Sequence, residues 1–243
     1  MLHIFDKVDS LFISIADFIV AKAGEAIARD GRFSLVLSGG NSPKKLHELL
    51  ASDAYRDKID WSKVFFFFGD ERYVPATHQD SNFLMAKNTL FDPLNIPKSQ
   101  VFPINTSLPP AGCAKAYEKD IQTFFGSKPV KFDVIILGLG DNSHTASLFP
   151  HTAVLHEKEA QVKEEYIEEV KMYRITLTAP TINDAHYIAF LLYGAGKAEA
   201  VKHILEDPRN IEEYPAQLIQ PTHGELHWFM DEAAADKLKS RKH

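Results

Sequence analysis

Cysteine is nearly absent from the sequence: the 243 residues include only Cys113. One thiol excludes an intramolecular disulfide and supplies too few thiolates for a structural zinc site. No run approaches the roughly 20 apolar residues that a membrane-spanning helix needs. The first residues also lack the basic start and the apolar core of a secretory signal. We therefore expect a cytoplasmic protein that does not enter a membrane.

Positive charge is also scarce. The 27 lysine and arginine residues are outnumbered by 33 acidic residues, which gives a formal net charge of −6. No basic run with interleaved aromatic residues occurs, so we expect no nucleic-acid partner. Because no linker or internal repeat divides the chain, we predict a single domain over residues 1–243. We expect it to be a monomer or a weak homo-oligomer.

Apolar periodicity predicts alternating helices and strands, the order that builds a layered α/β fold. Short apolar runs predict strands at residues 33–37, 64–68, 134–137, 174–178, 187–193 and 226–230. Helical spacing predicts helices at residues 10–29, 43–50, 80–90, 111–125 and 197–205, and a last one from residue 232. The acidic stretch 157–170 is interpreted as a solvated connector or edge. The expected fold is a single-domain, Rossmann-like layered α/β fold with a mostly parallel central sheet, flanking helices and a small additional strand region.

Residues 133–150, which read DVIILGLGDNSHTASLFP, are the most informative stretch of the chain. The apolar run is typical of a strand buried on both faces. Polar side chains, among them Asp141, Asn142 and His144, follow the glycines at its end. Ligands of open α/β sheets sit at this carboxyl edge. We therefore predict a chemical role for His144, rather than the structural role of a core histidine.

A second candidate site follows the strand at 33–37, where residues 38–43 read SGGNSP. Gly39 and Gly40 expose backbone N–H groups close to the positive end of a helix, which suits an anion. We predict that Asn41 or Ser42 caps that helix and that Pro43 lies in its first turn. The stretch matches no nucleotide-binding fingerprint, so the predicted anion is a phosphate outside a nucleotide.

Charged residues lie at three further strand ends. Asp70 and Arg72 follow the strand at 64–68, Arg174 begins the strand at 174–178, and Lys197 follows the strand at 187–193. Guanidinium forks suit phosphate or carboxylate, although Arg174 fits a solvated charge before a strand equally well. A lysine at a helix start is easiest to explain if an anion shares the site. We predict no metal site, and we interpret the histidines of residues 223–227 as part of a polar strand face.

Together these motifs resemble the 6-phosphogluconolactonase family, which has the glucosamine-6-phosphate isomerase/deaminase-like fold. The resemblance covers nearly the whole chain, and HTASLFP at residues 144–150 is specific for its lactonase branch. The other matching strings are SGGNSP at 38–43, DER at 70–72, SN at 81–82, GLG at 138–140, RITLT at 174–178, GAGK at 194–197 and ELHWFMDEAA at 225–234.

The resemblance implies hydrolysis of 6-phospho-D-glucono-1,5-lactone to 6-phospho-D-gluconate, in the oxidative pentose phosphate pathway, without a metal or cofactor. His144 matches the proposed general base of the family. The resemblance implies that phosphate and sugar oxygens are held by Arg72, Arg174, Lys197 and the loop at residues 39–42. Each of these groups could bind the phosphate or stabilise the oxyanion that forms during hydrolysis.

The chain departs from the family pattern immediately before His144. Where the family usually has Asp-Gly, this chain has Asn142-Ser143, and the carboxylate stands one place earlier at Asp141. We expect Asn142 rather than Asp141 to orient His144, and we expect Ser143 to avoid positive φ. Two other functions stay open: an isomerase/deaminase that acts on an amino-sugar phosphate, and a regulator that binds sugar phosphate without catalysis.

Overall fold

The central feature of the fold is a six-stranded sheet in the order β1-β9-β8-β5-β2-β3, in which every neighbouring pair is parallel. The computed structural model describes residues 1–239. Its central strands are β1 (Leu2–Phe5), β2 (Phe33–Leu37), β3 (Val64–Phe68), β5 (Val134–Leu137), β8 (Tyr187–Leu192) and β9 (Glu225–Asp231).

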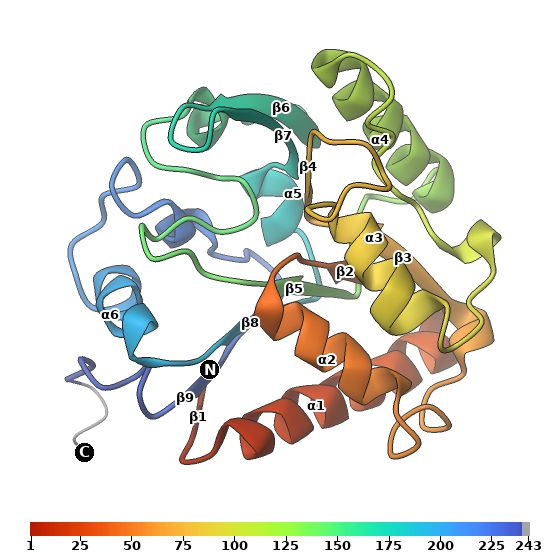
Figure 1. Ribbon diagram of the computed structural model, residues 1–243, viewed down its shortest axis with the longest axis horizontal. Coiled ribbons are helices and arrows are strands. Elements are labelled where there is room, and N and C mark those ends of the chain that lie inside the picture. Colours follow the sequence, from red (N-terminus) through yellow and green to blue (C-terminus); the bar gives the residue numbers. More distant parts are fainter. Residues whose placement is uncertain (240–243) are drawn as a thin grey trace.

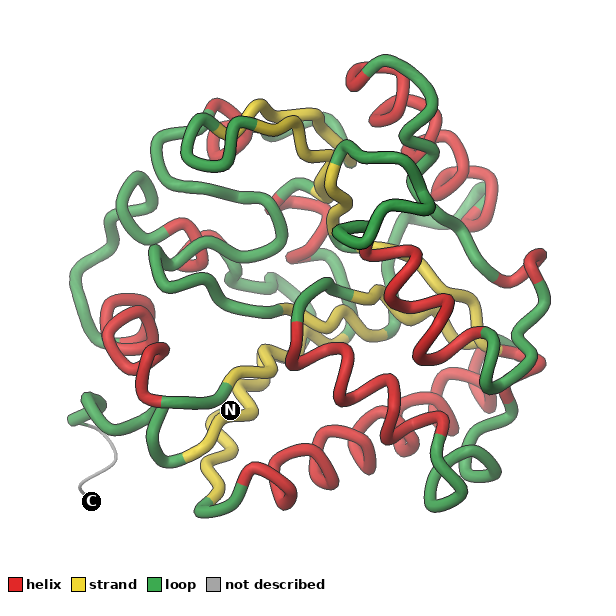
Figure 2. Tube along the Cα trace, viewed as in Figure 1, coloured by secondary structure: helices red, strands yellow, loops and turns green. Residues whose placement is uncertain are grey.

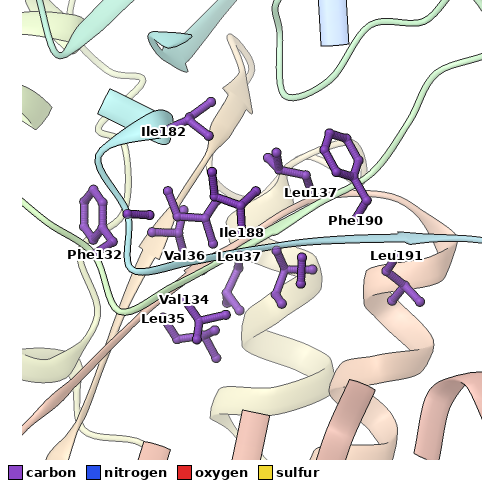
Figure 3. Packing of buried hydrophobic residues seen from close by; sticks show 14 of the residues in the cluster. Leu35, Val36, Leu37, Phe132, Val134, Leu137, Ile182, Ile188, Phe190 and Leu191 are labelled. Carbon is purple, nitrogen blue, oxygen red and sulfur yellow. The ribbon is translucent and has the colours of Figure 1, made fainter. Parts of the chain in front are cut away.

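The middle of this sheet is the core of the protein. All residues of β2 and β5 are buried, as expected for parallel strands that are covered on both faces. Val36 pairs with Phe67 on one side and with Ile135 on the other. Figure 3 shows the side chains of β2, β5 and β8 packed together in this region. Such burial holds the carboxyl ends of the strands in fixed positions.

Helices flank the sheet (Figures 1 and 2). In these views α1 and α2 lie on one side of it, whereas α4 and α5 lie on the other. Helix α1 ends at Gly31, whose φ of 74° gives the left-handed conformation that favours glycine. The helices are α1 (Val8–Asp30), α2 (Asn41–Ala51), α3 (Asn82–Ala86) with a π-turn at Lys87–Phe91, α4 (Pro110–Phe125), α5 (Ala179–Asn183) and α6 (Ala198–Leu205). Short 3₁₀ turns lie at Trp61–Lys63, Lys98–Gln100, Ala153–His156, Ala195–Lys197 and Pro215–Leu218.

A second, antiparallel sheet has the order β4-β7-β6. Its strands are β4 (Asp70–Arg72), β6 (Val162–Ile167) and β7 (Met172–Leu177). Gly69 joins the two sheets, since its N–H donates to the Leu37 carbonyl and its own carbonyl accepts from Leu177. The predicted fold class, a mostly parallel α/β sheet with helices on both faces and a small extra strand region, is confirmed.

Local structure differs from the sequence predictions in several places. Residues 162–167 of the acidic stretch, interpreted as a connector or edge, form β6, the strand at the edge of the small sheet, where they pair along β7. Strand β1 was not predicted at all, and it pairs with β9. Residues 232–237 form turns rather than a helix, and the Asp231 carboxylate, which accepts the N–H groups of Ala234 and Gly194, joins the start of these turns to the segment after β8.

Within residues 1–239, no helix is long and apolar enough to cross a membrane.

Candidate active site

The carboxyl ends of β2, β5 and β8 open into one cavity of about 530 Å³, a size typical of small-molecule sites. Residues of β4 and β7 close it from the side of the small sheet. Nine of the predicted site residues line this cavity: Gly39, Gly40, Asn41, Ser42, Asp70, Arg72, His144, Arg174 and Lys197. Asp141 and Asn142 are not among its lining residues.

His144 lies in the loop after β5, where its ring stacks on Phe149 with centroids 3.9 Å apart. The N–H of Gly140 donates to the His144 carbonyl at 2.8 Å, which closes the loop on itself. A Cβ atom on Gly140 would lie 2.1 Å from Nδ1 of the imidazole. Glycine is therefore required at position 140 for the ring to occupy this place.

The carboxamide of Asn142 holds the imidazole of His144 at its Nδ1 side. Its Oδ1 lies 2.5 Å from Nδ1 of His144, and its Nδ2 donates to Oε2 of Glu169 at 2.9 Å. The expectation for Ser143 is wrong, because its φ is 65°. A tight turn requires this conformation: the Ser143 N–H donates to the Gly140 carbonyl, and the Ser143 carbonyl accepts from Ala216.

Asp141 forms an ion pair with Lys197, with 2.6 Å between Oδ1 and Nζ. The Asp141 side chain is 79% exposed, so water screens this pair. The carboxylate makes no hydrogen bond to His144 within the described part of the chain; it neutralises Lys197 at the rim of the cavity.

The surroundings of His144 lower its pKa from 6.5 to about 4. Burial is the main cause, because it penalises the charged imidazolium, and Arg174 and Lys197 add to it by repulsion. Asp70 and Asp141 act in the opposite direction. His144 is therefore neutral at pH 7, the state in which an imidazole can accept a proton.

Arg72 and Arg174 stand opposite each other across the antiparallel β4–β7 pair. Like charges in this register repel each other, and burial lowers the pKa of Arg174, with Arg72 contributing. Nε of each guanidinium is buried and has no hydrogen-bond partner among residues 1–239. Two adjacent cations with unused donors form a site for an anion.

The carboxylates of Asp70, which lines the cavity, and of Glu71, which does not, are both held by hydrogen bonds within the protein. Asp70 accepts hydrogen bonds from Ser147 at 2.6 Å and from Asn82 at 3.2 Å. Glu71, which belongs to the DER motif but was not among the predicted binding residues, accepts the N–H groups of Asn82 and Phe83 and so fixes the start of α3. Burial raises the pKa of Glu71, although these hydrogen bonds oppose the effect.

The N-terminus of α2 also faces the cavity. The helix begins at Asn41 and its N-cap is Gly40, with no side-chain cap hydrogen bond, so the prediction that Asn41 or Ser42 caps it is wrong. Its first N–H groups are therefore available to a ligand. A Cβ atom on Gly39 would lie 1.9 Å from Oδ1 of Asn82, which explains glycine there.

Sequence reasoning missed Glu169 and Val170, which line the cavity from the turn between β6 and β7. No motif includes these two residues, and the acidic stretch 157–170 around them was interpreted as a solvated connector or edge. No group of three or more potential metal ligands occurs within residues 1–239.

A sequence model of the family described as glucosamine-6-phosphate isomerases/6-phosphogluconolactonase matches residues 6–228. The chain is 42% identical to a 6-phosphogluconolactonase of a Nostoc species over 229 residues, and 40% identical to one of a Synechocystis species over 226 residues. Each match covers 91% of this chain and 91% of the relative.

Two solved structures are similar along almost their whole length. The 6-phosphogluconolactonase of Trypanosoma cruzi superposes with a TM-score of 0.88 at 27% identity, covering 98% of this chain and 96% of that one. The Trypanosoma brucei enzyme gives a TM-score of 0.85 at 30% identity, with 98% of each chain covered.

Proposed function

Because the chain belongs to the family of glucosamine-6-phosphate isomerases and 6-phosphogluconolactonases, we propose that it hydrolyses 6-phospho-D-glucono-1,5-lactone to 6-phospho-D-gluconate in the oxidative pentose phosphate pathway. The observation that carries the site assignment is a neutral imidazole, hydrogen-bonded through Nδ1 to Asn142, in the same cavity as two arginines whose buried Nε donors have no partner among the described residues. A lactone phosphate needs both a proton acceptor and an anion site.

In this proposal Nε2 of His144 is the general base. Nδ1 donates to Asn142, so Nε2 is free to take a proton from water as the water oxygen bonds to the lactone carbonyl carbon. The carbonyl oxygen becomes an oxyanion, and Lys197 lies in the same cavity to stabilise it. The bond from carbon to the ring oxygen then breaks, the imidazolium returns its proton to that oxygen, and the new carboxylic acid loses a proton to solvent.

The phosphate is assigned to Arg72 and Arg174. Their unused Nε–H donors and mutual repulsion favour a doubly negative group between them. The uncapped N-terminus of α2, with Gly39, Gly40 and Ser42, is assigned to the oxygens of the sugar. The Asp70 carboxylate already accepts hydrogen bonds from Ser147 and Asn82, so we assign it to holding these residues in place rather than to binding substrate.

The proposed reaction uses no cofactor. We propose that residues 1–243 are one catalytic domain, active as a monomer or weak homo-oligomer. A cytoplasmic location is proposed because the single cysteine, Cys113, is buried as a free thiol, which suits a reducing compartment.

The test is to add purified protein to freshly prepared lactone and to follow product formation with 6-phosphogluconate dehydrogenase. We expect a rate far above spontaneous opening. A rate equal to the uncatalysed one would refute the proposal. Release of ammonia from glucosamine 6-phosphate, without lactone hydrolysis, would assign the chain to the isomerase branch instead.

A further inference from the structure

We propose that Glu169 is a positioning residue for His144 that acts through the side chain of Asn142. The proposal rests on the proposed function, in which His144 is the base. Glu169 lines the cavity together with His144, and its carboxylate reaches the back of the imidazole only through the intervening carboxamide.

The hydrogen-bonding capacity of the three groups fixes the direction of the chain. An ionised carboxylate can only accept, so Glu169 requires the NH₂ group of Asn142 on its side. The carbonyl Oδ1 of Asn142 must then face His144, where it can only accept. Nδ1 of His144 therefore carries the proton, and Nε2 carries the free lone pair that general-base catalysis needs.

Without Glu169, among the described residues only the long hydrogen bond from the His144 backbone N–H to Oδ1 of Asn142, at 3.3 Å, still favours this direction. The carboxamide of Asn142 could then rotate by half a turn and present its NH₂ group to Nδ1, which would select the opposite tautomer of His144 and place a proton on Nε2. That tautomer cannot accept a proton from water at Nε2. The carboxylate of Glu169 thus selects the reactive tautomer of His144 through two consecutive hydrogen bonds, one to Asn142 and one from Asn142 to the imidazole.

The hairpin between β6 and β7 holds Glu169 in place for this contact. Strand β6 ends at Ile167 and β7 begins at Met172. Backbone hydrogen bonds from Val170 to Ile167 and from Lys171 to Glu168 close the turn, and Lys171 adopts a φ of 47°. Among the described residues, Asn142 is the hydrogen-bonding partner of the Glu169 side chain. The small sheet therefore connects the loop after β5 to a fixed carboxylate.

The test compares Glu169→Ala with Glu168→Ala, a matched control on the same exposed turn. We expect Glu169→Ala to lower kcat roughly three- to tenfold with little change in KM, the range for an exposed charge-assisted hydrogen bond. Glu168→Ala is expected to keep the wild-type kcat. A wild-type kcat in Glu169→Ala, or an equal loss in both variants, would overturn the proposal.

Measuring kcat of Glu169→Ala and Glu168→Ala in an Asn142→Asp background tests whether Glu169 acts through the carboxamide of Asn142. An aspartate can accept from Nδ1 directly and cannot present a donor, so Glu169→Ala is expected to cost no activity there. An equal loss in both backgrounds would show that Glu169 acts by some route other than Asn142, and would overturn the proposal.

Imidazole ¹⁵N chemical shifts of His144 separate this proposal from the function on which it rests. They report which ring nitrogen is protonated, whether or not the protein hydrolyses lactone. We expect protonated Nδ1 in the wild type and a mixture of tautomers in Glu169→Ala. Unchanged shifts would overturn the positioning role even in an active lactonase, whereas a protein without lactonase activity would refute only the proposed function.

Discussion

With His144 as the proposed general base, its lowered pKa should set the acid limit of activity, and this limit can be measured. With a pKa of about 4 in the free enzyme, roughly one molecule in 1,000 carries a protonated His144 at pH 7. The base is therefore available over the whole neutral range. Because kcat/KM reports groups of the free enzyme and of the free substrate, it also contains the second ionisation of the substrate phosphate, at about pH 6. After correction for the doubly ionised fraction of the substrate, we expect kcat/KM to stay level from pH 8 down to about 5 and to fall only near pH 4.

The magnitude follows from the surroundings of the ring. A decrease from 6.5 to about 4 corresponds to about 3 kcal/mol of disfavoured imidazolium, at 1.36 kcal/mol per pH unit. Lys197 contributes to this decrease by repulsion. Lys197→Met removes that repulsion and also frees the Asp141 carboxylate from its ion pair. Both changes favour imidazolium, so the acid limb of this variant should move to higher pH even though its activity is lower.

The assay is a pH-stat measurement of acid release from the lactone between pH 4 and 8, with the uncatalysed rate subtracted at each pH. Circular dichroism at each pH provides the control for acid unfolding. An acid limb between pH 6 and 7 that remains in folded wild-type protein after correction for the ionisation of the substrate would refute the reasoning, because it would place the pKa of the base at its ordinary value. An unmoved limb in Lys197→Met would remove Lys197 from the electrostatics of the ring.

Four further outcomes test the rest of the site. His144→Gln should lower kcat by about 10²–10⁴-fold with an unchanged circular dichroism spectrum, whereas near wild-type kcat would remove His144 from the mechanism. Unphosphorylated gluconolactone should have a kcat/KM lower by about 10- to 150-fold, from the roughly 1.5–3 kcal/mol of a hydrogen bond to a charged group; equal values for both lactones would contradict the phosphate site. Gly140→Ala should displace the imidazole and lower kcat of the folded protein; an unaffected kcat would show that the ring position is not required. Asp141→Asn should change kcat little and Asn142→Ala should lower it; the reverse order in the coupled assay would assign the orienting role to Asp141.

The central sheet could be predicted because buried parallel strands read as continuous apolar runs. The sequence FSLVL of β2 and VIIL of β5 carry this pattern. Strands β4 and β6 carry no such pattern, since the first is three residues long and the second has half-buried charged residues. Their pairing with β7 depends on tertiary register, which local propensity does not encode.

The site residues that could be predicted are those that directly follow a predicted buried strand. Polar residues just beyond buried strands, such as His144 and Arg72, meet at one edge because parallel strands share a direction. Glu169 could not be found in this way, because it lies on a hairpin of the second sheet. Its distance in the chain from Asn142 is 27 residues, and only the packing of the small sheet against the loop after β5 brings the two together.

We propose an anion as the ligand of this cavity although the chain carries a net charge of −6. The proposal depends on which charged side chains of the site already have hydrogen-bond partners. The acids Asp70 and Glu71 are occupied by hydrogen bonds from Ser147 and from the start of α3, so their oxygens are not offered to a ligand. The guanidiniums of Arg72 and Arg174 keep buried donors free. We therefore expect affinity for a phosphorylated lactone to depend on these unpaired donors rather than on net charge. Because buried charges are screened less than exposed ones, this affinity should weaken only modestly with rising salt.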